Sequence, residues 1–290
     1  MIGERTRAQL DRYALATTAL SYEAGERMAR EPGQSIEFHD FRQYQPGDEL
    51  RYVDWRAYAR TGRLYTRLHQ AERTIRLHLL LDTSPSMQLF GKARFMSQLG
   101  QQLLYLAQRE SLAQVHAFSG TASRPSLGVR AIADTWAFMD QLASETDGTG
   151  PLPVQGIREF ATRTGLRSGR ALVLVLSDLL DPAPLRPALT ALRARGFDVS
   201  FLQLLADEDL EPREEMLELE DAESAEKLNV GPAEVREYRS AILRYVARTR
   251  SAILKAGFRH LLVRVPAVES ADLELEVFRA LLQSGIIIRR

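Results

Sequence analysis

The sequence predicts an α/β domain with a doubly wound, mostly parallel sheet that is covered by helices on both faces. From Thr74 onward, short apolar segments alternate with longer amphipathic ones, and this alternation is typical of strands buried between two layers of helices. Two of the apolar segments, residues 75–82 and 171–178, end in an aspartate. Because ligands of such sheets bind beyond the carboxyl ends of the strands, the two aspartates predict where a site lies.

The elements of this domain follow from the hydrophobic pattern. The predicted strands are residues 75–82, 113–119, 171–178, 198–205 and 260–265. The predicted helices are residues 91–110, 130–144, 153–165, 184–195, 232–256 and 270–283. Residues 206–226 are strongly acidic, and within them Met216–Asp221 alternates as an edge strand with outward charges does. We expect this acidic segment to be structural or to face a partner.

The first 70 residues follow a different pattern. Residues 7–29 are expected to form a helix, because apolar side chains recur along one mixed face. Beyond them come two extended pieces and an intervening turn, at residues 36–44, 63–69 and 45–49. The apolar residues here are too few for an independent core. We therefore expect residues 1–70 to form a helix and an irregular β arm packed on the main domain, which spans residues 71–290.

Eight arginines lie within residues 42–76, with tyrosines and Trp55 between them. Interleaved basic and aromatic side chains are also what a single-stranded nucleic-acid surface requires. Acidic residues, however, intervene in and beside this stretch, at Asp40, Asp48, Glu49, Asp54 and Glu72. They favour internal pairs of guanidinium and carboxylate groups under an aromatic cover. We therefore expect no nucleic-acid partner.

Charge and composition exclude several classes of protein. The 38 basic and 38 acidic residues give a formal net charge of zero, so no global field attracts nucleic acid or an anionic membrane. The chain has no cysteine, which excludes disulfides, thiolate metal sites and a cysteine nucleophile and is compatible with a reducing cytoplasm. The longest apolar runs are too short to span a bilayer. We therefore expect a cytoplasmic protein without a membrane span.

A candidate metal site follows the first predicted strand. The loop "DTSPSM" presents Asp82, Ser84 and Ser86 at alternate positions, so their side chains can point to one place. Thr149 and Asp178 stand in two later loops, and the five residues together supply oxygen ligands from three loops. Such hard ligands suit Mg²⁺, Mn²⁺ or Ca²⁺ rather than zinc. A metal held in this way keeps an open coordination position that a partner's carboxylate can fill.

Two of these side chains have an alternative role as helix caps. The Ser84 hydroxyl can cap a helix that begins at Pro85. Asp178 can cap a helix near Pro182, as can Asp181. The position of Asp178 at the end of a strand favours the metal role.

The histidines are predicted to be structural. All five are scattered along the chain without the spacing of metal ligands. His78 and His116 fall within two predicted apolar strands, so we expect them to be core residues whose polar atoms are satisfied.

The motifs resemble two known kinds of domain. Asp-x-Ser-x-Ser after a first strand, with a later threonine and aspartate, resembles the metal-ion-dependent adhesion site of von Willebrand factor A domains. Upstream, "RQYQPGD" and "RYVDW" resemble the bacterial family known as domain of unknown function fifty-eight, in which two such stretches precede a von Willebrand factor A-like domain. The resemblance covers residues 35–290 and implies the same fold here.

The resemblance extends to most of the metal ligands. The residues that match the family's site are Asp82, Ser84, Ser86 and Asp178. Members usually continue Gly-Thr-Ser-Leu at the threonine, whereas this chain has "GTGPLPV" over residues 148–154. Thr149 is the ligand that the pattern indicates, and Thr146 and Asp147 are its rivals. Magnesium is the implied ion, and no organic cofactor is expected.

The resemblance also implies a function. It implies a non-catalytic, cytoplasmic bacterial protein of a kind often encoded with a MoxR-type AAA+ ATPase. With that ATPase it would act as an adaptor in chaperone-like maturation or remodelling of a client protein. This chain contains no Gly-x-x-x-x-Gly-Lys-Ser/Thr loop, so any ATP dependence would come from the partner. We therefore expect a metal-dependent protein-interaction module and no enzyme.

The alternative is a Mg²⁺-dependent phosphohydrolase-like enzyme that uses Asp82 as its nucleophile. Such enzymes need a second aspartate two residues further on, where this chain has Ser84. A lysine that would support the phosphate is not evident in the sequence. Ser84 and Ser86 also lack the Gly-x-Ser-x-Gly context of a nucleophile elbow.

Overall fold

The computed structural model describes residues 7–8, 10–16, 38–45, 53–69, 76–108, 111–128, 132–144, 150–164, 171–212, 217–220, 227–265 and 271–289. The chain divides into two compact units. The larger unit comprises Met1–Tyr22 and Ile75–Arg290, and the smaller unit comprises Glu23–Thr74. The larger unit contains the predicted α/β domain.

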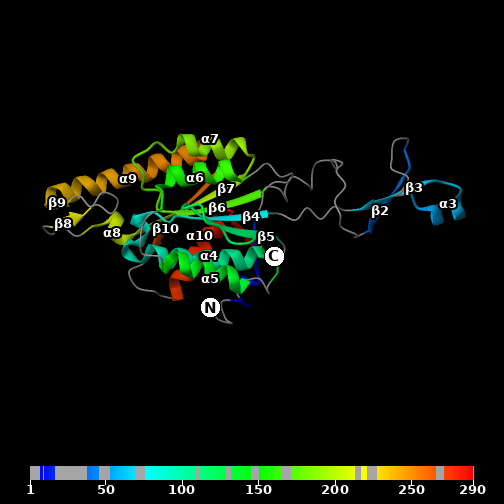
Figure 1. Ribbon diagram of the computed structural model, residues 1–290, viewed down its shortest axis with the longest axis horizontal. Helices are drawn as coiled ribbons and strands as arrows, with labels where there is room; N and C mark the ends of the chain where they lie inside the picture. The colour runs from blue at the N-terminus through cyan, green and yellow to red at the C-terminus, as the bar shows by residue number, and fades with distance from the viewer. Residues whose placement is uncertain are drawn as a thin grey trace. The chain divides into compact units, whose positions relative to one another are not determined.

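A five-stranded parallel sheet forms the centre of the larger unit, in the order β10-β7-β6-β4-β5 (Figure 1). Its strands are β4 (Arg76–Leu81), β5 (Leu112–Ala117), β6 (Ala171–Ser177), β7 (Asp198–Ala206) and β10 (Arg259–Val265). Of the five strands of this sheet, β4 comes first in the sequence. It lies between β5 and β6 and is parallel to both. The chain therefore winds outward from β4 in both directions, and the connections diverge beside its carboxyl end.

Helices cover both faces of this sheet (Figure 1). The helices on one face are α4 (Lys92–Gln108), α5 (Ile132–Ser144) and α10 (Ala271–Gln283), and those on the other are α6 (Pro153–Arg163), α7 (Arg186–Ala194) and α9 (Pro232–Lys255). Each layer shares a separate apolar core with one face of the strands. The predicted fold class, a doubly wound, mostly parallel sheet with helices on both faces, is confirmed. No helix in the described ranges is both long enough and apolar enough to cross a bilayer.

The acidic segment after β7 contains a small hairpin. The short helix α8 (Asp207–Leu210) follows β7 directly, and β8 (Leu217–Glu220) then pairs antiparallel with β9 (Lys227–Val230). The strand predicted within Met216–Asp221 is therefore confirmed. Its hydrogen-bonded neighbour is β9 rather than the main sheet.

The helix predicted over residues 7–29 is wrong at Tyr13–Leu15. Strand β1 (Tyr13–Leu15) pairs antiparallel with β11 (Ile287–Arg289). Leu15 and the preceding Leu10 are buried in the core beside α4 and α10. The pairing joins the two ends of the sequence, which local periodicity does not reveal. Most of residues 16–29 lies outside the described part of the chain.

In the smaller unit, the two predicted extended pieces form a pair of antiparallel strands. Strand β2 (Phe38–Gln43) pairs antiparallel with β3 (Tyr65–His69). An unpredicted helix, α3 (Trp55–Thr61), lies between them and is capped by Asp54, whose side chain accepts hydrogen bonds from two backbone amides. The turn predicted at residues 45–49 lies outside the described residues from Pro46 onward. Packing of this unit on the main domain stays a prediction.

Candidate metal centre

The carboxyl ends of β4 and β6 bring together the two predicted aspartates. These strands pair in register, Leu81 with Leu176, and the backbone amide of Asp82 donates to the carbonyl of Leu176 at 3.0 Å. Ser177, the last residue of β6, donates from its hydroxyl to Asp82 Oδ2. Asp178 follows at once, so the structure confirms that both aspartates lie at one edge of the sheet.

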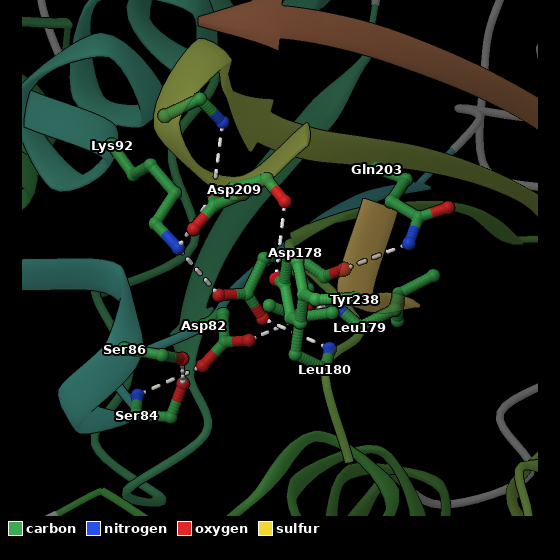
Figure 2. Close-up of polar contacts among 12 residues, drawn as sticks. Asp82, Ser84, Ser86, Lys92, Asp178, Leu179, Leu180, Gln203, Asp209 and Tyr238 are labelled. Atoms are coloured by element: carbon green, nitrogen blue, oxygen red, sulfur yellow. Dashed lines mark hydrogen bonds and ion pairs between the residues drawn. The ribbon is translucent and has the colours of Figure 1, made fainter. Parts of the chain in front are cut away.

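The loop after β4 holds the triad in a tight turn. Asp82 Oδ1 accepts a hydrogen bond from the Ser84 amide at 2.8 Å. The Ser84 and Ser86 hydroxyl oxygens lie 3.2 Å apart, and Figure 2 shows both serines beside Asp82. Ser84 stands before the 3-10 helix η2 (Pro85–Gly91), but its side chain makes no capping hydrogen bond. The alternative role of Ser84 as a helix cap is therefore wrong.

Asp178 is oriented by three contacts. Its Oδ1 accepts from the Leu180 amide at 3.0 Å, its Oδ2 accepts from Lys92 Nζ at 2.9 Å, and its carbonyl accepts from Gln203 Nε2 at 2.9 Å. The capping alternative does not apply to it. It is wrong for Asp181 as well, because no side chain caps the start of α7. Asp181 Oδ2 instead accepts from the Val154 amide in the first turn of α6.

The backbone after Asp178 is strained. Leu179 has a φ of 56°, a left-handed conformation that costs a residue with a side chain roughly 1–2 kcal/mol. Two contacts stabilise it: the Leu179 amide donates to Ser177 Oγ at 2.8 Å, and the Tyr245 hydroxyl on α9 donates to the Leu179 carbonyl at 2.6 Å. The strain is thus tolerated where the loop turns Asp178 toward the centre.

A lysine that the sequence reasoning missed completes the cluster. Lys92, the first residue of α4, is fully buried. Its Nζ lies 2.9 Å from Asp178 Oδ2 and 3.1 Å from Asp209 Oδ2, an acceptor on α8. Figure 2 shows Lys92 reaching from α4 toward both carboxylates. Two signals could have found it: the chain has only three lysines, and a cation is disfavoured at a helix N-terminus.

The cluster carries more negative than positive charge. Burial, and then the neighbouring Asp178 carboxylate, raise the pKa of Asp82 to about 7. The hydrogen bonds from Ser177 and Ser84 lower this pKa but do not outweigh the two causes that raise it. Burial alone would lower the pKa of Lys92, but the carboxylates of Asp178 and Asp209 outweigh it and raise that pKa. The cluster therefore contains one ammonium, paired with Asp178 and Asp209, and three carboxyl groups.

This excess of negative charge fits a divalent cation. Asp82 with the Ser84 and Ser86 hydroxyls offers hard oxygen donors of the kind that Mg²⁺, Mn²⁺ and Ca²⁺ prefer. The fifth predicted ligand, Thr149, and its rivals Thr146 and Asp147 lie outside the described residues. Within the described ranges, no three acidic, histidine or cysteine side chains are grouped to hold a metal. A cation here would thus depend on the serine hydroxyls.

The centre is closed, whereas its rim is open. Asp82 is 1% exposed and Ser86 8%. Three and four residues after Ser86, Leu89 and Phe90 of η2 are 42% and 48% exposed. The loop that carries the triad therefore also presents two apolar side chains to the surface.

Comparisons with known proteins match a family over most of the chain. A family model described as protein of unknown function DUF58 matches residues 40–252. Uncharacterized proteins of Mycobacterium bovis and Mycobacterium tuberculosis are each 27% identical over 234 residues, which are 72% of this chain and 68% of the relative. The matched family region contains the whole buried cluster, from Asp82 to Asp209.

Similar solved structures are distant. BatB from Bacteroides thetaiotaomicron is 13% identical with a TM-score of 0.40, over 73% of this chain and 98% of that chain. An aerotolerance-related membrane protein from Bacteroides fragilis is 15% identical with a TM-score of 0.42, with the same coverage. Mussel proximal thread matrix protein 1, with a zinc-occupied MIDAS motif, is 16% identical with a TM-score of 0.34, over 46% of this chain and 38% of that chain. Similarity of this extent supports no transfer of function.

Proposed function

The chain belongs to the DUF58 family, as its sequence predicted, and we propose that it is a non-catalytic, metal-dependent docking module. A divalent cation, Mg²⁺ first of all, would bind to Asp82, Ser84 and Ser86, with Asp178 beside them. The observation that carries this proposal is the unmatched negative charge next to two serine hydroxyls at the carboxyl edge of the sheet. Thr149 as a further ligand stays a prediction.

The residues of the chain would prepare this site in advance. The Ser84 amide and the Ser177 hydroxyl orient the Asp82 carboxylate from both of its oxygens. When bound, the cation would supply an open coordination position for a carboxylate of the partner protein. The exposed Leu89 and Phe90 would then add apolar contact area next to that carboxylate.

For the partner we propose a MoxR-type AAA+ ATPase, as the family resemblance implies. The protein would act in the cytoplasm as an adaptor between this ATPase and a client, in chaperone-like maturation or remodelling. The acidic hairpin β8–β9 and the apolar rim of η2 are separate elements, so one could contact the ATPase and the other the client.

One observation supports the phosphohydrolase alternative, and several oppose it. Lys92 is a buried lysine next to Asp178, and the sequence reasoning had found no such lysine. Its ammonium, however, is engaged by Asp178 and Asp209. Asp82 is 1% exposed and Ser84 occupies the position of the second aspartate. The arrangement therefore favours ion binding over phosphate transfer.

The proposal is tested by pulldown of the MoxR-type ATPase on immobilised protein with Mg²⁺, with EDTA, and with the variant Asp82→Ala. Recovery is expected to fall to background with EDTA and in Asp82→Ala, and to return when Mg²⁺ is restored to the wild type. Asp134→Ala, which removes an exposed carboxylate from α5, is the matched control and should bind as the wild type does. Equal recovery under all conditions would disprove metal-dependent docking.

A further inference from the structure

The buried Lys92 has a role that metal binding alone does not explain. We propose that its ammonium is an internal cation that competes with the metal for Asp178 and so keeps the affinity of the site for divalent cations low. This inference rests on the proposed metal site, but it concerns metal affinity and not the partner. It assigns Lys92 as a positioning residue of the centre and Asp209 as its second acceptor.

The position of Lys92 is unfavourable unless the carboxylates compensate. Burying an ammonium costs several kcal/mol, and the first turn of a helix carries partial positive charge that repels a cation. Lys92 is nevertheless fully buried at the first residue of α4. Its pairing with Asp178 and Asp209, at 2.9 and 3.1 Å, is the compensation that the structure offers.

The backbone before Lys92 is shaped to bring it into the centre. Phe90 and Gly91 have φ values of 55° and 73°, and these two left-handed residues end η2 directly before α4. An added Cβ at Gly91 would meet no atom within 4 Å, so glycine is favoured here by the dihedral angle and not by space. The turn places Lys92 only six residues after Ser86 in sequence, yet inside the same cluster (Figure 2).

Both oxygens of Asp178 already have partners. Oδ1 accepts from the Leu180 amide, in a loop that Tyr245 and Gln203 also hold. Oδ2 accepts from Lys92, whose side chain is flexible. A metal that takes Asp178 as a ligand, directly or through water, therefore displaces the ammonium more readily than the amide.

Asp209 can keep the displaced ammonium in an ion pair. Its Oδ2 lies 3.1 Å from Lys92 Nζ and also accepts from the Ala206 amide at 2.9 Å, which fixes the carboxylate. Lys92 can thus release Asp178 and remain paired. The ammonium then has two arrangements: without metal it is shared by both aspartates, and with metal it is held by Asp209 alone.

The experiment is calorimetric titration of the metal-free protein with Mn²⁺ and with Mg²⁺. Lys92→Met is expected to bind either ion about ten-fold more tightly or better, because a nearby positive charge and a competitor for Asp178 are both removed. Lys255→Met is the matched control, since it removes the same charge from an exposed position at the end of α9, and should titrate as the wild type does. Affinity in Lys92→Met that is no tighter, or an equal gain in Lys255→Met, would overturn the inference.

A double-mutant cycle separates competition from simple repulsion. If Lys92 acts through Asp178, the gain from Lys92→Met should largely vanish in an Asp178→Asn background, whereas repulsion through space would leave the gain intact and contradict the proposal. Lys92→Gln, which removes the charge but keeps a hydrogen-bond donor, replaces Lys92→Met if that variant does not fold. The pulldown does not enter these titrations, so failure of the docking proposal and failure of this inference are distinguishable.

Discussion

Two clusters of polar groups lie on the same parallel sheet, one half-buried and one buried, and they differ in whether they keep their charges. His78 on β4 and His116 on β5 share one hydrogen bond, Nδ1 to Nε2 at 2.9 Å. Phe160 packs against both imidazoles and Phe197 against His78. The cluster at the carboxyl ends of the strands keeps its charges instead, because Lys92 lies within hydrogen-bonding distance of two carboxylates.

The difference between the clusters distinguishes a structural group from a candidate site. Burial lowers the pKa of His78 to about 4 and that of His116 to about 3, so both imidazoles are neutral at physiological pH. The histidine pair, predicted to be structural, therefore needs no further partner. Around Asp82 the carboxyl groups outnumber the ammonium, and the excess negative charge favours the binding of a cation. Unmatched charge, rather than burial of polar atoms, marks the candidate site.

The largest effect is expected from Asp178→Ala. This change leaves Lys92 with Asp209 alone and removes the acceptor of the Leu180 amide. Removing one partner of a buried ion pair costs about 3–5 kcal/mol, which is the upper limit here because Asp209 still pairs with Lys92. The loss is measured as the free energy of unfolding in urea without metal. Asp134→Ala, on the exposed side of α5, should change it by no more than about 0.5 kcal/mol. A loss below about 1 kcal/mol for Asp178→Ala would mean that Lys92 does not depend on Asp178.

Acid is expected to act on the two clusters in opposite directions. The folded protein holds His78 and His116 neutral, with pKa values below the usual 6.5. Their contribution to stability is therefore present above about pH 6.5 and is lost as the pH falls toward the folded values, by up to about 1.4 kcal/mol per pH unit for each. The pKa of Asp82 is instead raised from 3.8 to about 7. Its protonation thus stabilises the metal-free protein at low pH, a contribution lost as the pH rises through about 7.

Urea unfolding at several values between about pH 7 and pH 5 with EDTA measures both contributions. The double variant His78→Phe/His116→Phe should lose less stability on acidification than the wild type. Asp82→Asn should lose more, because it removes the opposing gain. Identical pH profiles for the three proteins would contradict this assignment.

The smallest effect is expected from Tyr245→Phe. The variant keeps the ring and removes the hydroxyl that supports the strained Leu179, which should cost about 1 kcal/mol of unfolding free energy and weaken Mn²⁺ binding. Tyr238→Phe also removes a hydroxyl, one that donates to the Asp209 carbonyl at 3.0 Å. It should cost a similar amount of stability while changing Mn²⁺ affinity less. Equal Mn²⁺ affinities in the two variants would show that the Leu179 loop does not position Asp178 for the metal.

Most of the α/β domain could be predicted because its strands are mostly apolar. β6, for example, is buried at all seven positions. A continuous apolar run between amphipathic segments is typical of a strand buried on both faces of a parallel sheet. The helix expected over residues 7–29 was wrong at Tyr13–Leu15, because the backbone there pairs with Ile287–Arg289. Backbone pairing between the two ends of a chain leaves no local periodicity.

The candidate site was predictable only in part, for a related reason. Asp82 and Asp178 each end an apolar run, so their meeting at one edge follows from the parallel order. Ser177, Lys92 and Asp209 have no such marker, since their roles depend on hydrogen bonds across the fold. Thr149 stays a prediction.

By itself, the sequence determined the layers of the domain and the edge at which its carboxylates gather, because the spacing of apolar residues dictates which strands are buried and where they end. Only the tertiary structure decided the charge balance at that edge. Lys92 and Asp178 are 86 residues apart in sequence, yet their side chains are 2.9 Å apart. Electrostatic energy depends on distance in space and on burial, and neither can be read from the order of residues.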